Sequence, residues 1–476
     1  MKIVSNTFHF IGVGGIGMSG LAEVLFSLGA KVSGSDVKEG SMTTHLRKLG
    51  ITIYIGHDEK NVGEPDVVVY SSAISKNNPE YKFALKNRIP LIRRAEALAE
   101  LMRLRRGIAV AGTHGKTTTT SLVASMLMEA HMDPTVVVGG VVKKLNSNVK
   151  WGEGDWLVAE ADESDGSFDK LSPEIAIITN VDNDHLDFYG TYENLKMAYK
   201  NFAEKIPFYG RLIYCGDDND LRQIFSDFPK KSISYGFSQD CDYVLKSLGD
   251  SVYDVYFEDK KIGDFKSSLP GKHNGLNSLA AIIVGLEGLG LEFKLATKGV
   301  ESFEGVGRRF QIHPQTKLPM TFIDDYAHHP TEVYHVLEAV KERYPTQRIV
   351  TIFQPHRFSR VESCWDQFLE CFLRSDSLYI TDIYPAGELP IDGVNTENLV
   401  LGILKFLNSS DDYNPLKPNS NLNSKSNSTV YTKTAEWVSG DLDVVFAKIQ
   451  PSLKANDIIV VLGAGSINQL TPKFYS

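Results

Sequence analysis

The sequence predicts an α/β protein of three domains, each built on a largely parallel β-sheet covered by helices. Two observations lead to this prediction. Short apolar runs typical of buried strands alternate with runs of helical periodicity in three separate series. The 476 residues also exceed what one hydrophobic core organises, and three domains suit that length. The predicted domains cover residues 1–106, 107–313 and 314–476.

The composition is that of a soluble globular protein. Apolar residues make up 42% of the chain, charged residues 23%, and the formal net charge is −9, which argues against non-specific binding of nucleic acid. No segment reaches the roughly 20 apolar residues of a membrane helix, and residues 1–6 do not open a signal peptide. The four cysteines are scattered without a CxxC pair, which favours free thiols. We therefore expect a cytoplasmic protein without membrane insertion or a nucleic-acid partner.

The first series defines the N-terminal domain. Residues 8–13 are a short apolar run, residues 12–17 are a glycine-rich turn, and apolar residues then recur at helical spacing. Residues 31–36 and 67–70 are further strand candidates. Strands that alternate with a helix in this way predict βαβ units and a parallel sheet.

The turn Gly12-Val13-Gly14-Gly15-Ile16-Gly17 has the spacing of a dinucleotide-binding fingerprint, and the strand after it ends at the acidic Asp36. Taken alone, this pattern indicates an NAD-dependent oxidoreductase. The turn can equally hold another diphosphate, such as that of a UDP-linked substrate, because its amides and the helix N-terminus recognise phosphate. Both interpretations stay open at this point.

The second series defines the central domain. An apolar strand at residues 107–111 leads through the loop at 112–118 into a helix, and strands at 156–160 and 175–180 carry polar residues at their C-terminal ends. Ligands of open α/β sheets bind at that edge. We therefore expect the chemistry of this domain at the ends of these strands.

The loop Gly112-Thr113-His114-Gly115-Lys116-Thr117-Thr118 is the most informative segment, because a strand precedes it and a helix follows it, as in a P-loop. Its backbone amides can surround phosphate oxygens, Lys116 can reach the β and γ phosphates, and the Thr117 hydroxyl can bind Mg²⁺. The longer pattern has a glycine six residues before the lysine, where this chain has Val110, so the match is to the shorter form. The alternative is a chance Gly-Lys-Thr in an ordinary turn.

Acidic residues follow the next two predicted strands. Residues 160–165 read Glu-Ala-Asp-Glu-Ser-Asp, and residues 180–185 read Asn-Val-Asp-Asn-Asp-His. Carboxylate oxygens suit Mg²⁺, and a histidine beside them can bind a second metal or carry a proton. The alternative is a pair of solvated acidic loops, but the place of both runs after a P-loop favours a metal site.

The third series defines the C-terminal domain, with strands predicted at residues 320–325, 348–353, 377–382 and 457–462. Residues 408–429 are rich in Asn and Ser, and we interpret them as a solvated insertion.

Four polar clusters lie near predicted strand or helix ends. Arg308 and Arg309 can hold phosphate through bidentate contacts, and residues 324–332 and 354–360 combine histidines with charged side chains. Residues 271–277 open an apolar helix with two asparagines that can recognise a base or cap the helix. For each cluster alone, surface charge or a capped turn is the competing interpretation.

Taken together and in order, these motifs resemble the Mur ligase family over nearly the whole chain. The resemblance rests on residues 9–18, 112–118, 160–165, 180–185, 272–277, 307–310, 325–332 and 354–360. It implies a Rossmann-like N-terminal domain that binds the UDP part of a substrate, a P-loop ATPase-like central domain with a parallel sheet that binds ATP, and a Rossmann-like C-terminal domain that binds the amino acid.

The resemblance also implies the reaction: ATP-dependent ligation of L-alanine to the carboxylate of UDP-N-acetylmuramate through an acyl-phosphate, with ATP and Mg²⁺ as cofactors. It implies a cytoplasmic enzyme of peptidoglycan precursor synthesis that works as a monomer or homodimer on small-molecule substrates. Catalytic roles fall by resemblance on Lys116, Glu160, His185, Arg309 and His328. The implied metal ligands are Thr117, Glu160 and His185.

The binding residues that the resemblance implies fall into two sets. ATP is bound by Gly112, Thr113, His114, Gly115, Lys116, Thr117, Thr118, Asn277, Arg309 and Asp325. The substrates are bound by Gly14, Gly15, Ile16, Gly17, Tyr326, His356, Arg357 and Arg360, of which the four residues of the first turn face the uridine diphosphate.

Three rival functions remain. A murein-peptide ligase adds a whole peptide to the same sugar nucleotide, but the turn at residues 14–18 favours the alanine-adding branch. An NAD-dependent oxidoreductase does not need the intact loop at residues 112–118. A non-catalytic nucleotide-binding module would not need Lys116, Glu160 and His185 together.

Overall fold

In a computed structural model, the structure describes residues 6–71, 73–164, 166–313, 320–409 and 434–474, without the side chains of Ile16, Asn408 and Ser409. The chain forms two compact units, one of residues 1–268 with 273–307 and one of residues 269–272 with 308–476. The first unit contains two sheets and the second contains one. All three consist mainly of parallel strands, which confirms the α/β class predicted from the sequence.

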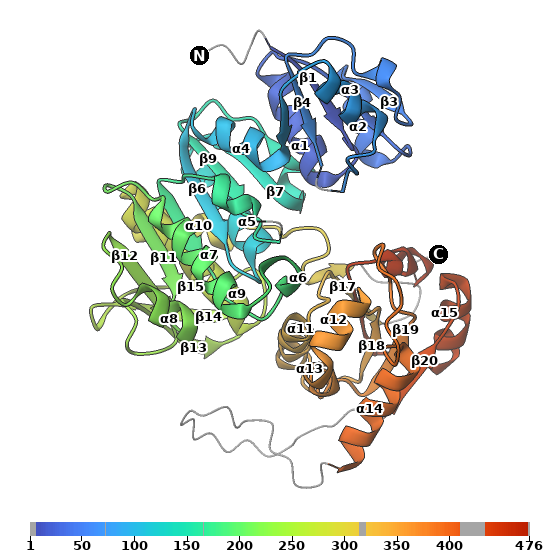
Figure 1. Ribbon diagram of the computed structural model, residues 1–476. Helices are drawn as coiled ribbons and strands as arrows, with labels where there is room; N and C mark the ends of the chain where they lie inside the picture. Colours follow the sequence, from blue (N-terminus) through green and yellow to red (C-terminus); the bar gives the residue numbers. More distant parts are fainter. Residues whose placement is uncertain (1–5, 72, 165, 314–319, 410–433, 475–476) are drawn as a thin grey trace. The chain divides into compact units, whose positions relative to one another are not determined.

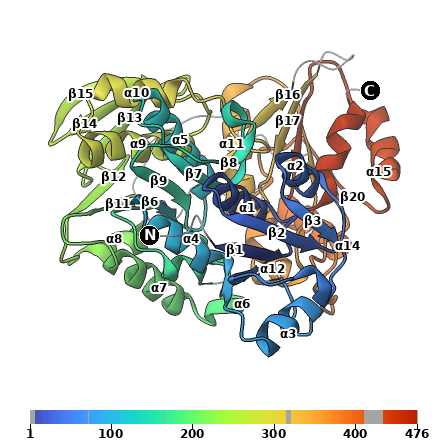
Figure 2. The same cartoon turned by 90° about the horizontal axis from the view of Figure 1, so that it is seen from above.

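The N-terminal sheet has five parallel strands in the order β3-β2-β1-β4-β5 (Figure 1). Its strands are β1 (Thr7–Ile11), β2 (Lys31–Asp36), β3 (Thr52–Ile55), β4 (Val67–Tyr70) and β5 (Leu91–Arg93). Its helices are α1 (Ile16–Ser27), α2 (Ser41–Leu49), α3 (Pro79–Lys86) and α4 (Arg94–Met102). Ala84 of α3 packs in a core cluster with Ile11 and Val68. Helix α1 lies against β2 (Figure 2).

The central sheet has ten strands in the order β15-β14-β13-β12-β11-β10-β6-β9-β7-β8. These are β6 (Arg106–Ala111), β7 (Thr135–Val142), β8 (Ser147–Lys150), β9 (Trp156–Glu160), β10 (Ile175–Ile178), β11 (Arg211–Cys215), β12 (Ser232–Gly236), β13 (Tyr243–Gly249), β14 (Val252–Phe257) and β15 (Lys260–Lys266). The strands from β7 to β13 are parallel, whereas β14, β15 and β8 pair antiparallel at the two ends.

The helices of this region are α5 (Lys116–Glu129), α6 (Leu186–Tyr189), α7 (Tyr192–Glu204), α8 (Asn219–Phe225), α9 (Lys272–Ile283) and α10 (Phe293–Glu301). All residues of α5 from Thr117 to Leu127 are buried. One contact is especially close, because a Cβ on Gly299 of α10 would lie 2.3 Å from the Met126 Cα of α5. Packing on all sides therefore fixes the helix that begins at Lys116.

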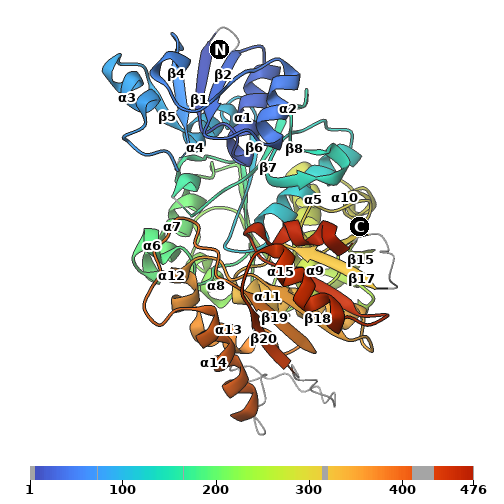
Figure 3. The ribbon, with the colours of Figure 1, turned by 90° about the vertical axis from the view of Figure 1, so that its right-hand side faces the viewer.

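The sheet of the second unit has the order β16-β17-β21-β18-β19-β20, with only β16 antiparallel (Figure 3). Its strands are β16 (Gln311–His313), β17 (Thr321–Asp325), β18 (Ile349–Phe353), β19 (Ser377–Thr381), β20 (Thr434–Val438) and β21 (Ile458–Leu462). Its helices are α11 (Pro330–Arg343), α12 (Phe358–Ser363), α13 (Trp365–Glu370), α14 (Thr396–Ser409) and α15 (Leu442–Ile449). Two core clusters lie on its two faces, one with α11 to α14 and one with α15.

Short helices complete the described parts: η2 (Glu59–Asn61), η3 (Lys143–Leu145), η4 (Ser167–Lys170), η5 (Val284–Gly288), η6 (Gln450–Ser452) and η7 (Ser466–Phe474). From residue 410 onward, the insertion predicted at residues 408–429 lies outside the described residues. Within the described ranges, no helix is both long and apolar enough to span a bilayer. The four cysteines are buried free thiols.

Candidate active site

The phosphate loop runs from the end of β6 to the start of α5 and requires glycine at two positions. Gly112 has φ 126° and Gly115 has φ 84°, a region that side chains other than glycine rarely adopt. A Cβ on Gly112 would lie 2.0 Å from Thr179 Oγ1, closer than atoms can approach. The glycines therefore let the loop pass close to the neighbouring strand end.

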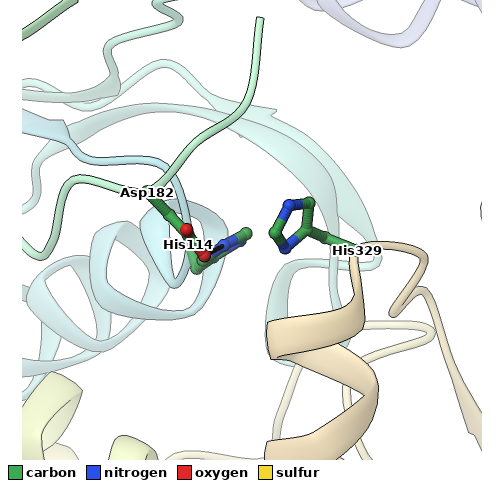
Figure 4. Close-up of side chains that lie close together, drawn as sticks. All are labelled: His114, Asp182 and His329. Carbon is green, nitrogen blue, oxygen red and sulfur yellow. Dashed lines mark hydrogen bonds and ion pairs between the residues drawn. The ribbon is translucent and has the colours of Figure 1, made fainter. Parts of the chain in front are cut away.

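The polar residues after β10 anchor this loop. Asn180 Oδ1 accepts a hydrogen bond from the His114 amide at 2.8 Å, and Thr179 Oγ1 donates to the His114 carbonyl at 2.6 Å. Thr113 Oγ1 accepts from the Asp182 amide at 2.9 Å, and His114 Nε2 lies 2.9 Å from Asp182 Oδ2 (Figure 4). The sequence placed Thr179 and Asn180 in the strand, but the strand ends at Ile178 and both side chains hold the loop.

Lys116 is held inside its own loop. Its ammonium donates to the carbonyl oxygens of Gly112 at 2.7 Å and Thr113 at 3.1 Å, and to Glu163 Oε1 at 2.7 Å. Burial lowers the pKa of Lys116, but the carboxylates of Glu163, Asp162 and Glu160 outweigh burial and raise it. The lysine therefore carries a positive charge at the point where a P-loop meets phosphate.

Thr117 and Glu160 meet at the start of α5. Thr117 Oγ1 lies 3.1 and 2.9 Å from the two Glu160 carboxylate oxygens, and the Gly139 amide of β7 donates to Glu160 Oε2 at 2.8 Å. A hydroxyl and a carboxylate held side by side are hard oxygen ligands, the donor type that Mg²⁺ prefers. The donor set present therefore fits the Mg²⁺ predicted from the sequence.

His185 and Glu163 form a second contact near the phosphate loop. His185 has φ 59° at the start of α6, and its Nε2 is 3.7 Å from Glu163 Oε1. Burial raises the pKa of Glu163 to about 7, and this carboxyl is fully buried. The sequence assigned no role to Glu163, because nothing in the acidic run distinguishes it from its neighbours.

Asn277, predicted to contact adenine, is 6% exposed and packs against the loop. Its Oδ1 accepts from Thr119 Oγ1 at 3.1 Å, and its Nδ2 is 3.3 Å from Asn274 Oδ1. A Cβ on Gly115 would lie 2.8 Å from Asn277 Oδ1. The described contacts of Asn277 therefore fix α9 on the loop and α5.

The first glycine turn follows β1, and the amides of Gly12 and Val13 bond to the Ser35 carbonyl of β2. Asp36 Oδ2 accepts from the Gly14 amide at 2.8 Å. The carboxylate that a dinucleotide fingerprint directs to a ribose thus already holds the turn, which weakens the NAD interpretation. A Cβ on Gly17 would lie 3.0 Å from Arg94 Nη1, so a cation stands close to this turn.

In the second unit, residues predicted to bind ATP and the amino acid gather around the end of β17. The guanidinium carbons of Arg308 and Arg309 lie 5.1 and 5.2 Å from the centre of the Tyr326 ring. Asp325 accepts from the amides of Phe310 at 2.6 Å and Ala327 at 2.8 Å, and burial raises its pKa to about 6. The Asp325 carboxylate thus accepts two backbone hydrogen bonds.

Two histidines of the second unit, His328 and His356, lie close together. His328 and His356 have ring centres 5.6 Å apart, and His356 stacks on Tyr384 at 5.4 Å. Burial, His328 and Arg360 lower the pKa of His356 to about 3, so its imidazole is neutral at physiological pH. His328 Nδ1 is 3.2 Å from Glu332 Oε2, a contact that the sequence did not reveal.

Arg357 and Arg360 lie around the start of α12. Arg360 Nη1 is 3.5 Å from His356 Nδ1, and Arg357 Nε is 3.9 Å from Glu388. Glu388 also accepts from the Ser359 amide at 3.1 Å and from its hydroxyl at 2.6 Å. Glu388 comes from the loop after β19, and no local signal marked it in the sequence.

Three family descriptions match successive parts of the chain. "Mur ligase family, catalytic domain" matches residues 7–106, "Mur ligase middle domain" matches residues 110–285, and "Mur ligase, glutamate ligase domain" matches residues 308–465.

Individual proteins match over nearly full length. A UDP-N-acetylmuramate–L-alanine ligase of Bdellovibrio bacteriovorus is 48% identical, over 98% of this chain and 97% of its own. The enzyme of the same name from Lawsonia intracellularis is 43% identical, over 98% of both chains.

Solved structures agree with these matches. A UDP-N-acetylmuramate–alanine ligase from Thermotoga maritima superposes with a TM-score of 0.79 at 30% identity, over 98% of each chain. A murein peptide ligase from Psychrobacter arcticus superposes with a TM-score of 0.69 at 22% identity, over 99% of this chain and 98% of its own, a likeness that shows the fold alone.

Proposed function

Because this chain belongs to the Mur ligase family, we propose that it is an ATP-dependent ligase that joins L-alanine to the carboxylate of UDP-N-acetylmuramate. The structural observation that best supports ATP as the substrate is the contact of Thr117 with Glu160 beside the charged Lys116. The choice of substrates rests on relatives of that name that match across 98% of the chain.

The reaction overcomes the poor reactivity of a carboxylate as an acyl donor. A carboxylate oxygen of UDP-N-acetylmuramate attacks the γ-phosphorus of ATP, the bond to the bridging oxygen breaks, and ADP leaves. The alanine nitrogen then attacks the acyl carbon, loses its proton to a base, and phosphate leaves. The product is an amide, and water must stay away from the acyl-phosphate in between.

The first unit supplies the groups for phosphoryl transfer in this proposal. The amides of residues 112–118 and the Lys116 ammonium hold the phosphates. Thr117 and Glu160 would hold Mg²⁺, and His185 would hold a second metal ion. When bound, Mg²⁺ neutralises the charge that develops on the phosphate oxygens. The turn at residues 12–17 holds the uridine diphosphate, supported by Arg94 next to Gly17.

The second unit supplies the amino-acid side. Arg357 and Arg360 are suited to a carboxylate, and the neutral His356 beside them adds no positive charge that would repel an ammonium group. We assign the proton of the alanine amine to His328, which Glu332 orients, and we place Arg309 and Asp325 on the nucleotide. The domain boundaries proposed for these roles are residues 1–106, 107–313 and 314–476.

The direct test is phosphate release from ATP and Mg²⁺ with UDP-N-acetylmuramate, while amino acids and a short murein peptide are varied. Release that requires both the sugar nucleotide and L-alanine supports the proposal. Release with the peptide alone makes the chain a murein-peptide ligase. If no pair releases phosphate, the proposal fails, and NAD binding becomes the next measurement. Because the reaction consumes ATP, we place the enzyme in the cytoplasm, as a monomer or homodimer.

A further inference from the structure

The ammonium group of Lys116 has no proton left for a phosphate. Its three N–H bonds match three acceptors: the carbonyl oxygens of Gly112 and Thr113 and the Oε1 of Glu163. The Lys116 side chain is 13% exposed and that of Glu163 is fully buried. A nucleotide phosphate that binds this lysine must therefore replace one of the three acceptors.

Glu163 is the acceptor that conflicts with phosphate. The two carbonyl groups are neutral and belong to the loop that surrounds the phosphate, so they can remain in place. Glu163 is instead an acidic group, and two acidic groups, its carboxyl and the phosphate, compete for the one buried ammonium. Because Glu163 Oε1 lies only 2.7 Å from Lys116 Nζ, it takes up an N–H bond of the ammonium that an incoming anion would need.

The backbone holds Glu163 in this position independently of the lysine. Its carbonyl accepts from the Tyr189 hydroxyl at 2.7 Å and from the Gly166 amide at 2.9 Å. The segment continues into η4, where Phe168 stacks on Phe202 of α7 with ring centres 5.1 Å apart. Glu163 is thus built into the site rather than a surface carboxylate that happens to reach the lysine.

The second oxygen of the carboxylate shows that the pairing is incomplete. Glu163 Oε2 is buried and has no hydrogen-bond partner among the described residues. Burial of a carboxylate oxygen without a hydrogen bond costs free energy. A phosphate can therefore displace Glu163 from Lys116.

We propose that Glu163 is a positioning residue that occupies Lys116 in the empty site and releases it when the β-phosphate of a nucleotide arrives. This inference rests on the proposed function, because it requires that residues 112–118 bind ATP. Glu163 then lowers nucleotide affinity, because each binding event includes the separation of a buried ion pair. The effect is confined to nucleotides whose phosphates reach Lys116. Glu163 therefore lowers the affinity for ADP and leaves the affinity for AMP unchanged.

The test compares ADP and AMP affinity by calorimetry for the native chain, Glu163→Gln and Asp162→Asn, all in EDTA so that no metal takes part. Glu163→Gln should bind ADP at least about fivefold more tightly than the native chain, the lower end of the usual range of coupling between sites. Its AMP affinity should change less than about twofold. Asp162→Asn removes a neighbouring carboxylate that acts on Lys116 through its charge alone and has its ion pair with Arg94, and it should leave ADP affinity within about twofold.

Each outcome decides between the two proposals. If Glu163→Gln binds ADP with native or weaker affinity, Lys116 keeps its partner in the bound state and the inference is wrong. Equal tightening by Asp162→Asn also overturns it, because general electrostatics then suffices. If the native chain binds no ADP with or without Mg²⁺, the proposed function itself fails. If Glu163→Gln does not unfold cooperatively, Glu163→Asp, whose shorter side chain withdraws the carboxylate, is subject to the same criteria.

Discussion

The hydroxyl of Thr117 lies 2.9 Å from one carboxylate oxygen of Glu160 and 3.1 Å from the other. The two residues are far apart in sequence, at the start of α5 and the end of β9, and the parallel pairing of β6 with β9 brings them to one sheet edge. Two hard oxygen donors at such a short separation are the basis of the metal assignment.

We expect Thr117→Val to raise the Mg²⁺ concentration for half-maximal phosphate release by more than about tenfold, because it removes one ligand and keeps the shape of the side chain. Thr117→Ser keeps the hydroxyl and should stay within about threefold of the native requirement. The measurement is a Mg²⁺ titration of phosphate release at saturating ATP. A valine variant with the native Mg²⁺ requirement would remove Thr117 from the metal site.

Gly112→Ala should destabilise the chain by at least about 2 kcal/mol and abolish ADP binding. Its φ of 126° is strained for alanine, and the new Cβ would lie 2.0 Å from Thr179 Oγ1. Urea denaturation and calorimetry measure the two effects. Gly40→Ala is the control, because Gly40 has φ −153° and no atom lies within 4 Å of the Cβ position. It should cost no more than about 1 kcal/mol, the usual effect of alanine at a helix N-cap, and leave ADP binding intact. Equal losses in both variants would contradict the steric explanation.

Local patterns predicted much of the fold. The strands Lys31–Asp36, Val67–Tyr70 and Trp156–Glu160 were predicted to the residue. The last two are apolar runs that end at a turn or a polar residue, and the first ends at the acidic Asp36. The antiparallel additions β8, β14 and β15 were not predicted. They are partly exposed, and their place at the ends of the central sheet depends on long-range pairing that no local pattern encodes.

The candidate site was also predicted only in part from the sequence. The loop at residues 112–118 was recognised because its function requires adjacent residues in a fixed order. Glu163 and Glu388 were passed over because their partners, Lys116 and Ser359, are brought to them by the sheet order and by a loop. A charged residue that acts through a distant partner leaves no periodic or spacing signal in one sequence.

Glu80 is the centre of a buried polar network in the N-terminal domain, and we expect Glu80→Gln to lower stability by about 1–3 kcal/mol at neutral pH. Its carboxylate is fully buried and accepts from the Ser35 hydroxyl, from Asn61 Nδ2 at 2.8 Å and from the Asp58 amide at 3.2 Å, and it lies 3.3 Å from His9 Nε2. Burial raises the pKa of Glu80, but the bonds from His9, Ser35 and Asn61 outweigh burial and lower it.

The lowered pKa fixes the direction of the pH dependence. As the pH falls below 4.5, the ordinary pKa of this group, the unfolded chain takes up the proton first, so the contribution of Glu80 is present above that pH and is lost below it. The difference between native and variant should therefore shrink as the pH approaches 4. Urea denaturation from pH 4 to pH 8 measures it. Glu39→Gln, which removes an exposed partner of Arg47, should stay within about 0.5 kcal/mol throughout. A loss in Glu80→Gln that does not depend on pH would point to packing rather than charge.

His356 makes the second unit lose stability in acid, and His356→Gln should reduce that loss. Burial first, then the charges of His328 and Arg360, lower the pKa of His356 from 6.5 to about 3. Between these two pH values, His356 binds a proton in the unfolded chain but not in the folded chain. The free energy of unfolding therefore falls as the pH decreases from about 6.5 to about 3. Glutamine does not titrate, so the variant lacks this slope.

Unfolding monitored by urea between pH 7 and pH 4.5 should therefore show a shallower decline for His356→Gln than for the native chain. His335→Gln, on α11 with its ring edge-on to that of Tyr334, is the matched control for the loss of a histidine. If His356→Gln declines as steeply as the native chain, the imidazole is already protonated in the folded state, and the neutral partner that we assign to the amino-acid side is wrong.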